Sequence, residues 1–552
     1  MESGRFLLAV VLMIAVVVVT NILLPAPRPT ETEPVPAGQT TATTPTDSPT
    51  PPPALPAQPA APAPAPVESA ATMPADTVWA TSPEWRFGFS TRGGALVSAE
   101  MLRYQSFAAE TEGQPVELVP DSSALLHHHL RVGDTDIDLS TLVFEPASPG
   151  GVSLDEGSGP GVLEMTYRDP DRGTGIQLRY TFDADRYAFD VNARILGADA
   201  SSSQLIIDVG PRLASNEAVP AEDDRALSFV ARSTETGIAN FTLARFRDEQ
   251  IVNGPLTWFA LKSKYFVAAA ISDTTGSPFG GVIATPAGDH RASLAATLLP
   301  GRDGEFHYRM YLGPQEPDRL AALGLQDVAV FGWKFLQPIL RPLGHAITWA
   351  LLQMHRALGL GYGWVLILFG FLVRFVLWPL NATAMRSQIK NMEMQPRIKE
   401  IQTRYKSDPE KLQKEMLRLY KEEGFNPMGG CLPMFLPFPV LIALFFVFQS
   451  TIEFRGVSFL WLPDLSRADP LYILPIALGI SMFVLQLLNL RSVKGQPTQM
   501  KYMTYIMPVF MTLLFLRFAS GLNLYYASMN IASVPQQLQI MREKKKRLGG
   551  KP

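Results

Sequence analysis

The chain has 552 residues, enough for several domains, and its formal net charge of −3 says little because the charges are segregated along it. The single cysteine, Cys431, excludes an intramolecular disulfide and any metal site built on several cysteines. The mean hydropathy of +0.09 averages a largely polar stretch, up to about residue 330, and a strongly apolar remainder. The chain therefore combines a soluble part with a membrane part.

The N-terminus contains an apolar segment, Phe6 to Leu24, which is long enough to span a bilayer. A cleaved signal peptide is the alternative, but neither its shorter apolar core nor a small-x-small cleavage site is clear here. We predict an uncleaved anchor at residues 1–24. Residues 25–76 are rich in Pro, Ala and Thr, and this composition predicts an extended linker.

Residues 77–330 carry short segments in which apolar and polar residues alternate, separated by Gly-Gly, Asp-Pro and Gly-Pro pairs. Examples are Trp85–Ser90, Gln177–Phe182, Tyr187–Ile195 and Glu305–Leu312. Alternation with this punctuation predicts an antiparallel β-sandwich.

This region shows no recognisable catalytic motif: its acidic residues are scattered, and we find no nucleophile elbow, phosphate loop or zinc-binding helix motif. His127, His128 and His129 are consecutive, so at most two could converge on a metal from a strand. We interpret them as a solvated loop or strand end. The sequence predicts no enzyme, no metal site and no cofactor.

Residues 331–360 mix aromatic, aliphatic and basic residues at helical spacing, and Pro338 and Pro342 are expected to break the helix. We interpret the segment as amphipathic and interfacial. A simple extension of the following membrane span is the alternative.

Five apolar stretches follow and, with the anchor, predict six transmembrane helices. They are Gly363–Leu380, Cys431–Gln449, Leu471–Leu490, Tyr502–Phe518 and Leu522 to about Ile540. The last stretch contains Asn, Tyr and Ser residues that are too polar to face lipid on every side, so it should pack inside a bundle.

The first of these stretches, within residues 361–380, contains Arg374, and a charged side chain in lipid costs about 3 to more than 10 kcal/mol. It lies six residues before the end of the stretch, roughly 9 Å inside it. We expect Arg374 to face a wet cavity or a polar partner inside a bundle. A snorkelling side chain on a tilted helix is the alternative.

Basic residues gather in the segment 381–429, in the loop 491–501 and in the tail 542–552. The positive-inside rule places all three in the cytoplasm. Six spans, with residues 430–541 as the last four, then place both termini in the cytoplasm and the β domain outside.

The segment 381–429 is predicted to be a cytoplasmic helical hairpin. Ser407 or Asp408 can cap the second helix, and Pro409 suits its first turn. That helix carries Leu412, Met416 and Leu419 on one face and should end at Gly424. This face either packs within the hairpin, docks at the membrane surface or meets an incoming chain.

Several motifs carry a resemblance to a known family. They are VRFVLWPL (373–380), NPMGGCLPMFLPFPVLIALFF (426–446), DPLYILPIALGISMFVLQ (469–486), SGLNLYYASMNIASVPQQ (520–537), TRGG (91–94) and LGPQEP (312–317). With them, the chain resembles the YidC family of bacterial membrane protein insertases, in the Gram-negative form with a large domain after the first span. The resemblance covers essentially the whole chain apart from the linker.

The resemblance implies an inner-membrane insertase and chaperone without an energy source of its own. Its five-helix core would form a hydrophilic groove, open to the cytoplasm and lipid and closed to the periplasm. The implied partners are nascent membrane proteins, the Sec translocon, the ribosome and the phospholipid bilayer. Candidate groove residues are Arg374, Gly370, Leu377, Gln449, Gln486, Tyr525, Tyr526 and Asn530.

Three positions depart from the family pattern. Pro437 replaces a polar residue, Gly370 a hydroxyl-bearing one and Arg517 an aromatic one, so the groove is expected to be less polar at its centre. Two other functions compete with an insertase. A polar-solute transporter or channel usually brings internal repeats, and none is seen. A carbohydrate-binding or carbohydrate-modifying protein rests on the β-sandwich alone.

Overall fold

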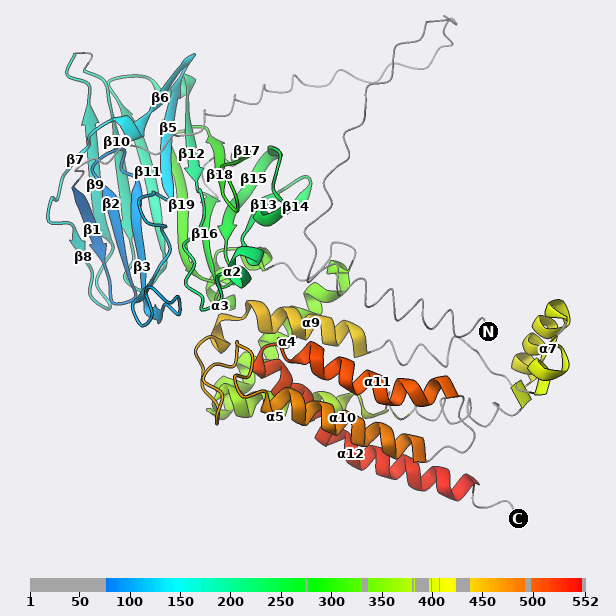
Figure 1. The fold of residues 1–552 in the computed structure, drawn as a ribbon. Coiled ribbons are helices and arrows are strands. Elements are labelled where there is room, and N and C mark those ends of the chain that lie inside the picture. The colour runs from blue at the N-terminus through cyan, green and yellow to red at the C-terminus, as the bar shows by residue number, and fades with distance from the viewer. Residues whose placement is uncertain are drawn as a thin grey trace, which may run out of the picture. The chain divides into compact units, whose positions relative to one another are not determined.

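The computed structural model describes residues 76–548, with gaps at 172, 274–276, 330–335, 380–381, 383–396, 399, 407, 423–436 and 492–497 (Figure 1). The predicted anchor at residues 1–24, nearly all of the linker at 25–76 and the end of the basic tail lie outside the described residues.

Nineteen strands form the first part of the described chain. They are β1 (Thr77–Thr81), β2 (Trp85–Ser90), β3 (Leu96–Gln105), β4 (Pro115–Glu117), β5 (Leu126–Val132), β6 (Thr135–Asp138), β7 (Glu145–Pro146), β8 (Val152–Ser153), β9 (Gly161–Arg168), β10 (Gly175–Phe182), β11 (Ala188–Leu196), β12 (Ser203–Val209), β13 (Ser228–Ser233), β14 (Gly237–Thr242), β15 (Gln250–Lys262), β16 (Phe266–Ser272), β17 (Phe279–Pro286), β18 (Ala292–Leu298) and β19 (Glu305–Pro314).

The strand pairings follow one continuous order, β1-β2-β3-β5-β12-β18-β17-β15-β16-β19-β11-β10-β9. Among the described strands every pairing is antiparallel except β1 with β8. β15 belongs to both halves of this order: Gln250–Asn253 pair with β17, and Trp258–Lys262 pair with β16. A register shift between Asn253 and Leu256 separates the two parts of β15, as a β-bulge does where a strand bends.

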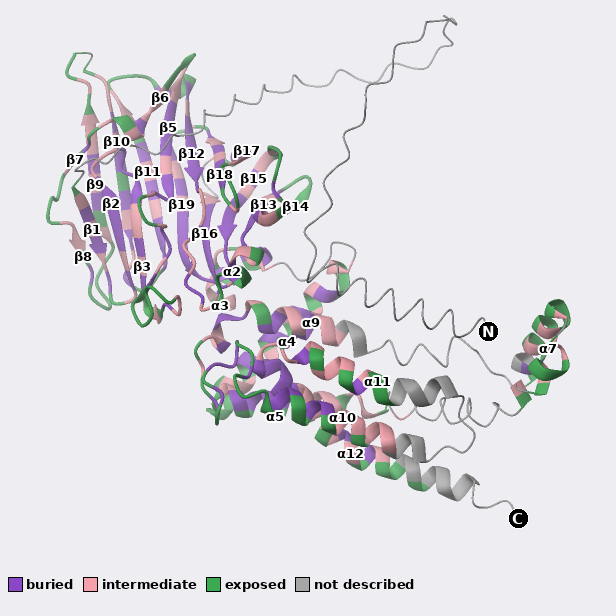
Figure 2. Cartoon of the chain, in the orientation of Figure 1, coloured by how far each residue is buried: buried purple, intermediate pink, exposed green. Residues whose placement is uncertain are grey.

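The two halves of this order pack face to face through aromatic side chains. Phe89 on β2 lies 4.5 Å from Tyr180 on β10, between ring centroids, and Phe87 lies 5.6 Å from Phe189 on β11. Since β2 pairs with neither β10 nor β11, these contacts join two layers. Figure 2 shows buried residues along the strands. The region is thus the predicted sandwich, because alternation gives each strand an apolar face of its own.

The interpretation of the histidines as solvated was wrong. They lie within β5, and His128 and His129 are buried. The His128 Nε2 lies 2.6 Å from the hydroxyl oxygen of Tyr308 on β19, and burial lowers the pKa of His128 to about 3, so its ring is neutral. The hydrogen bond offsets the cost of burying a polar ring.

Helices dominate the rest of the described chain. They are α2 (Pro220–Ala226) and α3 (Pro317–Ala322) in the β region, then α4 (Gln337–Leu358), α5 (Tyr362–Val376), α7 (Pro409–Glu422), α9 (Pro437–Ser450), α10 (Ile473–Arg491), α11 (Thr498–Phe515) and α12 (Ser520–Leu548). Among the described residues no single helix has both the length and the apolar composition to cross a membrane; α4 and α5 meet these criteria together, across a bend of 119°.

The five apolar stretches overlap α5, α9, α10, α11 and α12, while the number of membrane spans stays a prediction. The prediction that both prolines break the amphipathic segment was wrong, because α4 runs through Pro342. Pro342 is the sixth residue of α4, so its missing N–H removes only one intrahelical hydrogen bond. The bend after α4 also shows that this helix is not a straight extension of α5.

α7 agrees with the predicted second helix of the hairpin. The Lys411 N–H donates to Asp408 Oδ1 at 3.1 Å, so Asp408 caps the helix as expected. Leu419 is buried, and Leu412 and Met416 are half-buried. Ser407, Gly424 and most of the first helix lie outside the described residues.

Candidate functional site

α5 and α12 pack closely together, and Gly370 is the reason that they can. A Cβ at Gly370 would lie 3.0 Å from the Tyr525 carbonyl oxygen and 3.1 Å from the Ser528 Cβ. Small residues at such positions let two helices approach closely. Gly370, which replaces a hydroxyl-bearing residue of the family pattern, therefore allows the two helices to pack closely in this chain.

Arg374 lies one turn after Gly370, on the same face of α5. Its Nη2 donates to Gln536 Oε1 at 2.6 Å, and the Gln536 Nε2 donates to the Trp378 carbonyl oxygen at 3.1 Å. Gln536 is buried and Arg374 is half-buried. The amide thus links the guanidinium to a backbone carbonyl just beyond the end of α5.

The partner of Arg374 is neutral, and this decides what the site can do. Arg374 forms no ion pair with a described residue, and its Nε is buried without a hydrogen-bond partner. A guanidinium has five N–H donors and recognises carboxylates by two parallel hydrogen bonds. The negative end of the α5 dipole favours a cation here but takes up none of these donors, and among the described residues only Gln536 accepts a hydrogen bond from the guanidinium. The site can therefore bind an anionic group.

Tyr525, Tyr526 and Asn530 lie on α12 but contact different helices. The Tyr525 ring lies 5.8 Å from Phe369 on α5, and the Tyr526 ring 5.3 Å from Phe515 on α11. The Asn530 Nδ2 donates to Ser481 Oγ on α10 at 3.1 Å. α12 is thus in contact with α5, α10 and α11, which suits its polar composition.

The other candidate residues are more dispersed. Leu377 directly follows α5 and is half-buried, as is Gln486 on α10. Gln449 is exposed at the end of α9. A Cβ added at Gly521 on α12 would lie 2.9 Å from the neighbouring residue, Phe448. Gly521 precedes Gln536 by fifteen residues, which is about 22 Å along α12. Gln449 is therefore not beside Arg374.

Sequence reasoning missed Gln536 and Ser481. Gln536 follows Tyr525 by eleven residues, three helical turns, and this spacing places it on the face of α12 that meets α5. The sequence contains this spacing, but it does not show that α5 is the helix against which this face of α12 packs. Pro437 begins α9, and Arg517 is exposed between α11 and α12.

One face of α5 is apolar and exposed. Its residues recur at helical spacing: Trp364, Leu368, Phe371, Leu372 and Phe375. Phe375 is 75% exposed, directly beside half-buried Arg374. An apolar stripe of this kind marks a surface that faces lipid or another protein.

Comparison with known proteins identifies the class. Residues 78–344 match the model of the YidC periplasmic domain, and residues 353–547 match the model of the 60Kd inner membrane protein. A membrane protein insertase YidC of Cupriavidus necator is 33% identical over 86% of this chain and 84% of its own length. That of Chlorobaculum tepidum is 30% identical over 81% and 79%.

Among solved structures, an active YidC insertase with the first transmembrane domain resolved is 18% identical and covers 84% of this chain and 94% of its own, with a TM-score of 0.33. The sequence relatives decide the assignment: the chain belongs to the YidC family of membrane protein insertases. The resemblance is confirmed, and the chain is an inner-membrane insertase with a periplasmic β domain, from a family of non-enzymes.

Proposed function

We propose that this insertase receives the acidic, translocated segments of its clients at Arg374, in a hydrophilic groove lined by α5, α10 and α12. The observation that carries the proposal is the neutral partner of Arg374, which leaves donors of the guanidinium available. Tyr525, Tyr526, Asn530 and Gln486 would line the groove further along.

The physical task is to carry a short polar segment past the hydrocarbon core. Each charged or unpaired backbone group of that segment is costly in lipid. A groove that reaches part of the way across shortens the path, and Arg374 attracts acidic side chains into it. The apolar client segment would leave past the exposed face of α5, where burial in lipid returns roughly 25 cal/mol per Å².

The wider arrangement belongs to the same proposal. The six spans place both termini and the 381–429 hairpin in the cytoplasm, where the basic residues of the hairpin meet anionic lipid or the ribosome. The insertase works alone or beside the Sec translocon and also assists client folding. The charges of α7 and its single apolar stripe support a capture role, because little burial holds such a helix in place.

Site-specific photocrosslinking to a stalled nascent membrane protein tests the proposal. A crosslinker at 377 or 526 should capture the client. Matched positions are the lipid-facing Val484, which is 47% exposed on α10, and Gln449 at the far end of α9. Equal capture from 377, 526 and 484 would refute a defined groove.

A further inference from the structure

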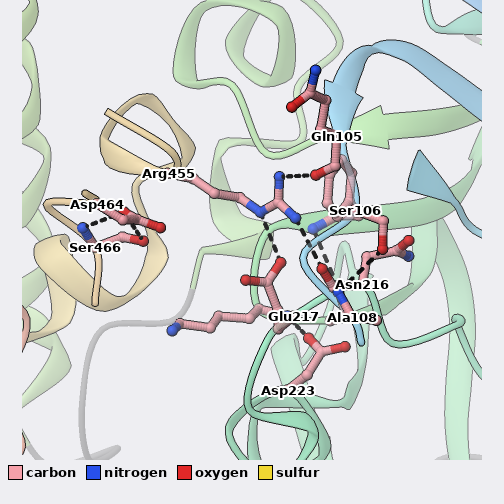
Figure 3. Close-up of polar contacts among 12 residues, drawn as sticks. Gln105, Ser106, Ala108, Asn216, Glu217, Asp223, Arg455, Asp464 and Ser466 are labelled. Carbon is pink, nitrogen blue, oxygen red and sulfur yellow. Dashed lines mark hydrogen bonds and ion pairs between the residues drawn. The ribbon is translucent and has the colours of Figure 1, made fainter. Parts of the chain in front are cut away.

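The loop between α9 and α10, residues 451–472, contacts three parts of the molecule, and we call it the cap loop. It holds Arg455, whose side chain is only 3% exposed. An arginine this far buried needs a complete set of partners. Figure 3 shows those partners on the β domain.

Arg455 is surrounded on the polar and the apolar side. Its Nε donates to Glu217 Oε1 at 2.8 Å, its Nη1 to the Gln105 carbonyl at 2.8 Å and its Nη2 to the Asn216 carbonyl at 3.0 Å. The guanidinium carbon lies 4.3 Å from the centroid of the Phe107 ring, with Tyr265 and Phe266 further out. Cation–π contact and charge-assisted hydrogen bonds act together.

The β domain holds this pocket in shape by itself. The Asn216 Nδ2 donates to the carbonyl oxygens of Glu117 and Ala214, at 2.7 and 3.2 Å. The Phe107 N–H donates to the same Asn216 carbonyl that receives Arg455. A receptor whose groups are already fixed loses little freedom on binding.

The other side of the cap loop contacts the start of α12. The Ser520 Oγ donates to the Asp464 carbonyl at 2.9 Å, and the Ser520 N–H donates to the Arg467 carbonyl at 2.6 Å. The Gly521 N–H donates to the Leu465 carbonyl at 2.9 Å. The loop thereby satisfies N–H groups that a helix leaves unpaired at its start.

The same loop also lies against the first turn of α5. Phe459 packs so tightly on Gly363 that a Cβ there would lie 2.1 Å from the phenyl ring. The Trp364 ring meets Phe459 edge-on at 5.4 Å. The starts of the two helices that carry Arg374 and Gln536 are therefore both held by the loop that Arg455 fastens.

We propose that Arg455 is a positioning residue: it fixes the cap loop to the β domain, and through the loop the β domain keeps the outer ends of α5 and α12 closed. This inference rests on the proposed function, in which the β domain and these helix ends lie on the same, outer side of the membrane. Arg455 contacts no client in this role.

The experiment uses the full chain in lipid nanodiscs, without a client, and measures amide hydrogen exchange in residues 456–466. Arg455→Met should speed exchange there at least tenfold, since Glu217 is left buried without its charge partner. The double variant Arg455→Met with Glu217→Met should restore much of the protection, because an apolar pair can replace a buried ion pair. The control is Arg309→Met, which removes an arginine–aspartate pair with Asp190 on the β domain away from the loop.

A second readout tests closure. In a Cys431→Ser background, Leu522→Cys places a thiol at a buried site in the first turn of α12. In vesicles, a membrane-impermeant thiol reagent added on the side of the β domain should label it at least fivefold faster with Arg455→Met than without. Unchanged exchange in Arg455→Met would overturn the fastening role, and faster exchange without faster labelling would overturn the closing role. Neither readout depends on insertion, so failure here and failure of the groove proposal are distinguishable.

Discussion

Two arginines in this molecule, Arg455 with a buried side chain and half-buried Arg374, meet opposite surroundings. Arg455 in the cap loop has a carboxylate, two carbonyl oxygens and aromatic rings. In the described part of the chain, Arg374 on α5 has one neutral amide as its partner, and its buried Nε has none. A cation with all its partners inside the protein is structural. A cation with donors to spare can bind a ligand, and this difference separates the residue that holds the fold from the one that we expect to serve the client.

Replacing each arginine by methionine should expose the contrast most strongly. Arg455→Met removes the charged partner of buried Glu217, and breaking a buried ion pair in this way costs about 3–5 kcal/mol of stability. Arg374→Met removes one hydrogen bond to a neutral partner and should cost about 1 kcal/mol or less. Unfolding of both variants in detergent, followed by circular dichroism, measures the difference. Equal losses would contradict the comparison.

The pH dependence of stability tests the buried pair of Arg455 and Glu217. Burial raises the pKa of Glu217 from 4.5 to about 7, although Arg455 and Lys264 lower it. The folded state then binds more protons than the unfolded state between these values. The free energy of unfolding therefore falls as pH rises from about 4.5 to 7, by up to about 3 kcal/mol at 1.4 kcal/mol per pKa unit.

The measurement compares wild type with Glu217→Gln from pH 5 to 8. The stability of wild type relative to this variant should decrease as pH rises. Burial also raises the pKa of Glu453 in the cap loop to about 7. Glu453→Gln is the matched control, because it removes a buried carboxyl that titrates in the same range but is not paired with Arg455. An advantage of wild type that grows with pH would show that attraction to Arg455 outweighs burial, and that Glu217 is ionised throughout.

The close contact of α5 and α12 predicts a stability effect of intermediate size. Gly370→Val would push against the Tyr525 carbonyl and Ser528, and such overpacking typically costs 1–3 kcal/mol. Gly361→Ala, where a Cβ meets nothing within 4 Å, should change stability by about 0.5 kcal/mol or less. Full stability of Gly370→Val in detergent unfolding would show that the helices separate easily.

Changing the hydrogen-bond partner of Arg374 tests whether this arginine is available to acidic clients. Gln536→Glu would give Arg374 a carboxylate and should lower the insertion of acidic clients several-fold, because the client must compete with it. Gln536→Leu removes two hydrogen bonds, to Arg374 and to the Trp378 carbonyl, at about 1 kcal/mol each, and should leave acidic clients preferred. Insertion into proteoliposomes measures both. Identical behaviour of the two variants would argue against competition at this cation.

The sequence predicted what depends on local pattern. Alternation along each strand gave the sandwich, and the cost of a charge in an apolar helix gave the polar partner of Arg374. The features that were not predicted depend on contacts between residues far apart in the sequence. His128 is buried because Tyr308, 180 residues away, offers a hydroxyl, and Gln536 lies 162 residues from Arg374. The sequence around Arg455 does not indicate its role, since an arginine in a loop is usually solvated and its pocket comes from residues 105–107 and 216–217.

The most direct test of the central claim combines Arg374 with client charge. A series of clients that differ only in the number of acidic residues in the translocated segment is inserted by wild type, Arg374→Ala and Arg374→Lys. A close charge pair at intermediate dielectric is worth about 4 kcal/mol, and solvent reduces this. We expect Arg374→Ala to lose at least tenfold on the acidic clients and far less on the neutral one, with Lys retaining much of the activity. Equal losses on acidic and neutral clients would contradict the account.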